Sequence, residues 1–95
     1  MPFPDFVVHH PEDTVGVVVV ETVTGGRRLD GWVMDTDTSV AAHAREPIPL
    51  GHKIALRDIA DGETVVKYGH DIGRAVAPIK AGAHVHVHNL KTKRW

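Results

Sequence analysis

The sequence of 95 residues contains no cysteine. This absence excludes disulfide bonds, and it excludes iron–sulfur clusters or thiolate zinc sites built by this chain alone. A metal ion would have to take its ligands from histidine, aspartate, glutamate or backbone oxygens. A chain without cysteine also fits a cytoplasmic location, which we expect for this protein.

Long apolar runs and a charge excess of one sign are also missing. No stretch approaches the ~20 apolar residues of a membrane-spanning helix. No basic region followed by an apolar segment opens the sequence, so we expect no signal peptide. Eleven basic and twelve acidic residues leave a formal net charge of -1. This balance gives no electrostatic basis for binding nucleic acid or an acidic membrane.

The chain has no long helical pattern and consists mostly of short β-branched runs between glycine and proline turns. We therefore predict a single, mainly β domain over residues 1–95. The expected strands cover residues 6–10, 14–22 and 27–34, with Trp32 as the largest core side chain. Three alanines between residues 39 and 44 favour a helical turn there.

One pattern occurs twice in the second half of the chain. Residues 59–65 and 79–85 each contain an apolar anchor, a two-residue spacer, a glycine turn and the start of a strand. The second copy follows the first by twenty positions. Two copies are too few for a solenoid, so we predict two similar loop-and-strand units that face one another.

The most unusual stretch is the alternation of histidine with valine at residues 84–88. In an extended strand successive side chains point to opposite faces, so His84, His86 and His88 would share one face. Such a row suits a metal ion, an anionic ligand or proton transfer near neutral pH. The alternative is a solvent-facing edge strand. At the strand rise His84 and His88 would lie ~13 Å apart, so a pair with a ligand from elsewhere is the favoured metal site.

Other candidates lie in two glycine-containing segments. His52 follows Gly51, and a surface loop would explain it equally well. Lys67, Tyr68 and His70 surround Gly69, where a solvated lysine and a packed tyrosine are the simpler interpretations. The histidines of residues 84–88, together with Asn89 and the nearby Lys67, are candidates for binding a carboxylate or a sulfonate.

Three segments in order, residues 48–59, 66–75 and 84–90, resemble the SAF-type domain of the altronate and galactarate dehydratase family. The resemblance implies a β-clip fold. In that family the domain commonly begins a longer chain, whereas this sequence stops soon after the third segment. Its length resembles a stand-alone small subunit that completes the active site of a large dehydratase-like subunit. A small β domain with open edges can also self-associate when isolated.

The resemblance also implies a reaction and its residues. The expected reaction is elimination of sulfite from (2R)-3-sulfolactate to give pyruvate, with iron (Fe²⁺) bound mainly by the large subunit. A sugar-acid dehydratase subunit and a non-catalytic module that binds small anions or carbohydrates are the alternatives. We predict three groups of site residues: catalytic His52, His86 and His88; substrate-binding Lys67, Tyr68, His70 and Asn89; and metal ligands His86 and His88.

Overall fold

The computed structural model describes residues 3–92, which form nine short strands and no helix. None of these residues belongs to a helix that could cross a membrane. The mainly β prediction is confirmed. The strands are β1 (Phe6–Val8), β2 (Val15–Val18), β3 (Arg28–Val33), β4 (Thr38–His43), β5 (Lys53–Ala55), β6 (Thr64–Lys67), β7 (His70–Ala75), β8 (His84–Val85) and β9 (Leu90–Lys91).

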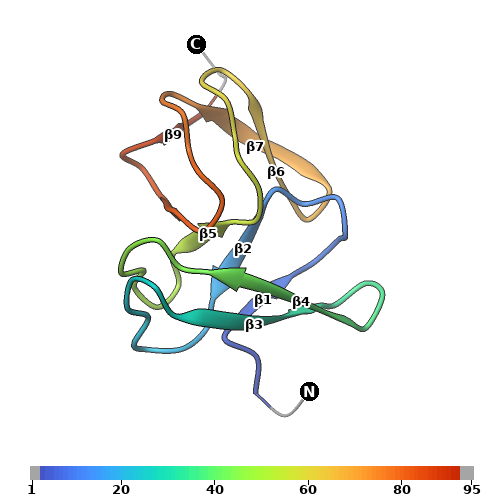
Figure 1. The fold of residues 1–95 in the computed structure, drawn as a ribbon. Helices are drawn as coiled ribbons and strands as arrows, with labels where there is room; N and C mark the ends of the chain where they lie inside the picture. Colours follow the sequence, from blue (N-terminus) through green and yellow to red (C-terminus); the bar gives the residue numbers. More distant parts are fainter. Residues whose placement is uncertain (1–2, 93–95) are drawn as a thin grey trace.

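The strands form two sheets, seen as the lower and upper parts of Figure 1. One sheet has the order β4-β3-β1-β2-β5-β8, and the other has the order β6-β7-β9. The buried apolar side chains form two clusters: one lies in the larger sheet, and the other joins Val65 and Ala75 of the smaller sheet to Val15, Ala55 and Val85 of the larger one. β5 connects the two groups, because Ile54 belongs to the first and Ala55 to the second. The pair β5·β8 therefore lies where the two parts of the molecule meet.

The long apolar run at residues 14–22 forms a shorter strand than predicted. β2 ends at Val18, and Val19 is 42% exposed. Its partners β1 and β5 are three residues long, and their pairings end at Val18 and Val17. Beyond this point the bonds go to residues outside the strands, since Val19 N–H donates to the Asp5 carbonyl at 2.9 Å and the Val18 carbonyl accepts from Gly51 N–H at 2.8 Å, so the regular ladder stops. The expected burial on both faces holds for Val15 and Val18.

Two predictions in the first half of the chain are wrong. The segment 39–44 is strand β4, not a helical turn, because it pairs with β3 over six positions and this pairing overrides alanine's helix propensity. Trp32 is only half-buried, and its indole N–H donates to Asp37 Oδ1 at 2.9 Å. The fully buried aromatic ring is that of Phe6, which occupies the space beside Gly31 that a Cβ there would fill.

The predicted repeat is confirmed as two units that face one another. The backbone N–H of Ile59 donates to the carbonyl of Ile79 at 2.7 Å, and the reverse bond measures 2.8 Å. Gly62 and Gly82 occupy equivalent turns with φ of 85° and 86°. Each unit also bonds across to the strand that precedes the other, since Gly82 N–H donates to the carbonyl of Ala55 and Gly62 N–H to that of Ala75. These crossed hydrogen bonds place β8 beside β5, with which it pairs.

Candidate functional site

The histidine-rich stretch is not one extended strand, so that prediction is wrong beyond Val85. β8 ends at Val85, and the chain then turns back. Asn89 holds this turn: its Oδ1 accepts from His86 N–H at 2.9 Å, and its Nδ2 donates to the His84 carbonyl at 2.9 Å. The turn brings the His84 and His88 ring centroids to 5.0 Å. The imidazoles are therefore gathered by a turn and not by a strand face.

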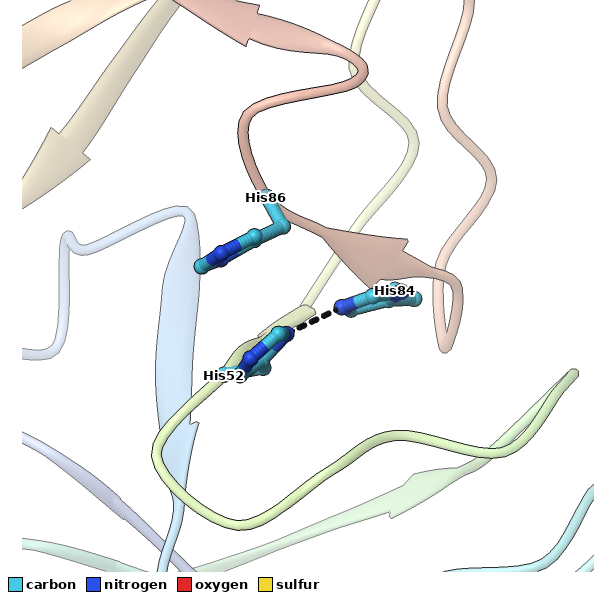
Figure 2. A group of neighbouring side chains, drawn as sticks. All are labelled: His52, His84 and His86. Atoms are coloured by element: carbon cyan, nitrogen blue, oxygen red, sulfur yellow. Dashed lines mark hydrogen bonds between the residues drawn. The ribbon is translucent and has the colours of Figure 1, made fainter.

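Three imidazoles form a compact group, the histidine triad, made of His52, His84 and His86 (Figure 2). His52 lies just before β5, while His84 and His86 come from β8 and the turn after it. The register Ile54 opposite His84 places the two segments side by side. His52 Nδ1 and His84 Nε2 share a hydrogen bond of 2.7 Å. The His52 and His86 rings are stacked, with centroids 3.7 Å apart and planes 15° apart.

The surroundings of the triad favour neutral imidazoles. Burial lowers the pKa of His84, the nearby His88 and His52 lower it further, and Glu46 partly opposes them. Burial likewise lowers the pKa of His86, with contributions from His52 and Lys53. Both side chains are thus held neutral over a wider pH range than a free histidine. A neutral imidazole offers a nitrogen lone pair to a proton or a metal ion.

The triad fits a divalent transition-metal ion. One candidate ligand atom from each ring lies within 4.8 Å of the other two. Metal–nitrogen bonds of about 2.1 Å require ligand atoms no more than about 4.2 Å apart, so small side-chain rotations would close the set. Over residues 3–92, His86 Nδ1 is the one buried side-chain polar atom without a hydrogen-bond partner. Imidazole ligands suit iron, zinc, nickel and copper.

The triad differs from the predicted residue set at two positions. His52 and His86 were predicted and are in it. His84 belonged to the predicted row but was assigned no role, although it contacts both other members. His88 is exposed and lies outside the triad, touching only the His84 ring among the three. His84 joins the triad because it lies opposite Ile54 of β5. The sequence repeat would indicate this position only after the two loop-and-strand units had been paired with one another.

Asn89 has a clear structural task, because both ends of its amide bond the local backbone. Lys67, Tyr68 and His70 lie around the hairpin turn between β6 and β7. Tyr68 has a positive φ of 58°, and its ring contacts that of His9 with centroids 3.5 Å apart. Exposed His70 lines a separate open hollow of about 580 Å³. The catalytic, substrate-binding and metal-ligand roles assigned from the sequence stay predictions.

Comparison with known proteins identifies the family. Residues 4–93 match the model of the altronate/galactarate dehydratase SAF domain. The chain belongs to this SAF domain family. Over 91 residues it is 59% identical to the (2R)-sulfolactate sulfo-lyase subunit alpha of Chromohalobacter salexigens, covering 96% of this chain and 97% of that protein.

Two further SAF relatives place this similarity in context. The (2R)-sulfolactate sulfo-lyase subunit alpha of Paracoccus pantotrophus is 54% identical over 52 residues, which cover 55% of this chain and 78% of that one. The altronate dehydratase of Bacillus subtilis is 37% identical over 87 residues, which cover 92% of this chain but only 16% of that enzyme. The SAF domain thus occurs both as a short protein and as a small part of a long one.

Proposed function

We propose that this chain is the small subunit of a (2R)-sulfolactate sulfo-lyase, a carbon–sulfur lyase. The observation that carries this proposal is the 59% identity to a subunit alpha over nearly the full length of both chains. The reaction is a β-elimination. A base removes the proton from C2 of 3-sulfolactate, the electron pair forms the C2–C3 double bond, and the C3–sulfur bond breaks. Sulfite leaves with the bonding electrons, and the resulting enol becomes pyruvate.

The histidine triad is the part of the site that this chain supplies in our proposal. Neutral His84 and His86 carry lone pairs that accept a proton or bind a metal ion. The shared hydrogen bond between His52 and His84 holds these two rings next to one another. We place the triad facing the large subunit, with the substrate enclosed between the two chains, because the triad is only half-buried in this chain.

The family resemblance implies iron, and the triad has a donor set that iron accepts. His52, His84 and His86 would hold Fe²⁺ together with ligands from the large subunit. When bound, such an ion supplies positive charge that stabilises the enolate-like charge formed as the C2 proton leaves. Neutral imidazoles of this chain would hold the ion without compensating its charge.

The partner in this proposal is a large dehydratase-like subunit. The two altronate dehydratases contain the matched region as 16% of their length, fused to a much longer chain. The matched region makes up 97% of the sulfo-lyase subunit alpha of Chromohalobacter salexigens, so in that arrangement the remainder would come from a second polypeptide. Neither subunit alone would then form a complete site.

Sulfite release from racemic 3-sulfolactate tests the proposal. The assay is run anaerobically with ferrous iron on this chain, on the large subunit and on their mixture. We expect sulfite only from the mixture. An intact, metal-loaded complex that releases no sulfite would contradict the sulfo-lyase assignment.

A second candidate is a sugar-acid dehydratase subunit. The 37% and 39% identities to altronate dehydratases favour it over unrelated functions. The two reactions share proton removal next to a carboxylate but differ in the leaving group. Incubating the same complex with altronate and galactarate, and measuring the keto acid product, separates the two activities.

A further inference from the structure

Two lysines, one of them beside the histidine triad, have no acidic ion-pair partner within residues 3–92. Lys53 begins β5 directly after His52, and Lys67 ends β6. Both are half-buried, and neither forms an ion pair within residues 3–92. By contrast, exposed Lys80 has its ammonium group 4.0 Å from the carboxylate of Asp58. Unpaired cations are usually left fully in water, because burial without a counter-ion costs free energy.

The fold links the two strands that carry these cations through β2. Lys53 lies opposite Val85 in the β5·β8 pair and opposite Val17 in the β2·β5 pair. β2 in turn contacts β6, which ends at Lys67. The Lys67 ammonium lies 4.6 Å from the centre of the Tyr68 ring, whose π face stabilises the charge without neutralising it.

The charges of these groups act on one another. Burial lowers the pKa of Lys53, and the charge of Lys67 lowers it further. Lys53 in turn contributes to the lowered pKa of His86. Geometry gives the positions: Lys53 lies opposite Val85, the residue between His84 and His86, which places it beside the triad. Hydrogen bonds between Thr14 and Val66 join the start of β2 to the residue before Lys67.

We propose that Lys53 and Lys67 form an oxyanion-binding site beside the histidine triad, which receives one anionic end of the substrate. This inference rests on the proposed function for the identity of the substrate, which carries a sulfonate and a carboxylate. An oxyanion placed between the two ammonium groups would supply the counter-charge that the chain itself does not provide. Lysine binds such groups as a point charge. The triad then faces the reacting carbons while the lysines hold one end of the molecule.

The isolated chain tests this site without its enzymatic activity. We would titrate the ¹⁵N-labelled chain with methanesulfonate and, separately, with acetate, following backbone amide shifts. For each anion we would compare wild type with Lys53→Met, Lys67→Met and the matched control Lys80→Met. Methionine retains most of the alkyl stem, and an unchanged spectrum away from the substitution establishes that the variant is folded.

The expected result is a set of saturable shifts around Lys53, Lys67 and His86. Lys53→Met and Lys67→Met should each weaken binding roughly 10-fold, as expected for loss of one charge-assisted contact. Lys80→Met should bind like wild type. The anion that binds more tightly identifies the end of the substrate that is held. Equal affinities for Lys53→Met and Lys80→Met, or no saturable shift in wild type with either anion, would overturn the proposal.

The assembled enzyme gives a second, independent readout. Lys53→Met should raise the KM for 3-sulfolactate roughly 10-fold, and Lys80→Met should leave KM unchanged. An unchanged KM in Lys53→Met would contradict the assignment of this site to the substrate. If wild-type enzyme does not act on sulfolactate at all, the function proposal fails, whereas the titration of the isolated chain still decides whether the oxyanion site exists.

Discussion

The two loop-and-strand units share a backbone but not a chemistry. Residues 59–65 and 79–85 have the same glycine turn and the same antiparallel contact at Ile59 and Ile79. At the position before the buried valine, however, one unit carries Thr64 and the other carries His84. The first unit continues into the β6–β7 hairpin, and the second continues into the histidine turn held by Asn89. The two units thus share a backbone structure, and the histidines of the second unit and of the turn after it make that copy part of the candidate site.

The largest expected effect comes from the glycines of the two turns. At Gly82 an added Cβ would run into the His43 carbonyl oxygen, whereas at Gly62 it would meet open space. Both have positive φ, which costs a non-glycine residue about 1–2 kcal/mol. We expect Gly62→Ala to cost that amount and Gly82→Ala at least about 3 kcal/mol, because its clash with backbone adds to the strain. Urea unfolding monitored by circular dichroism gives both values. Equal losses would contradict the close contact at Gly82.

The next effect concerns metal binding by the isolated chain. His84→Thr gives the second unit the residue found in the first and removes one imidazole from the triad. We expect the affinity for Zn²⁺ or Fe²⁺, measured by calorimetry under anaerobic conditions, to fall at least roughly 100-fold. His88→Thr removes a neighbouring imidazole outside the triad and should change affinity much less. Similar losses in both variants would favour the row of alternating histidines over the triad.

A smaller effect is expected in the pH dependence of stability. The pKa values of His84 and His86 are lowered from 6.5 in the folded chain, so the unfolded chain binds protons more readily below that pH. Their contribution to stability is therefore complete above pH 6.5 and is lost as pH falls through the folded pKa values. Unfolding midpoints in metal-free buffer from about pH 8 to pH 5 should decline less in His84→Asn/His86→Asn than in wild type. The exposed His43→Asn is the matched control. A double variant with the wild-type slope would contradict the protonation account.

The smallest expected effect is at the histidine turn. Asn89→Asp retains the acceptor for His86 N–H but loses the donor to the His84 carbonyl, and Asn89→Ala loses both. We expect losses of about 1 kcal/mol for the first substitution and about 2 kcal/mol for the second, near one hydrogen bond each. Thermal unfolding separates them. If Asn89→Ala were neutral, the side chain would not be what holds the turn.

Much of the frame could be predicted from the sequence, because glycine positions and β-branched runs act locally. The repeat and its facing arrangement followed from two glycine turns twenty positions apart. The failures came from long-range contacts. Strand β4 forms because β3 lies beside it, and Trp32 stays half-buried because it alternates with the buried positions Leu29, Gly31 and Val33 and so lies on the other face of β3. Neither fact is visible in local propensity.

The candidate site shows the same division. The histidine density of residues 84–88 indicated where imidazoles gather, and His52, also predicted, lies among them. The predicted row on one strand face was wrong because Asn89 turns the chain, which alternation alone does not indicate. Both ends of the Asn89 amide bond the backbone of the turn, but the sequence does not distinguish this asparagine from any other polar residue. Only the register of β5 with β8 brings His84 to His52.

The most direct test of the account compares His84 with His88 in the assembled lyase. The large subunit is mixed with wild-type chain, His84→Ala or His88→Ala, and sulfite release from 3-sulfolactate is measured after confirming that each complex forms. The account predicts that His84→Ala abolishes activity and that His88→Ala retains most of it. Full activity in His84→Ala, or equal losses in the two variants, would contradict a site built on the triad of His52, His84 and His86.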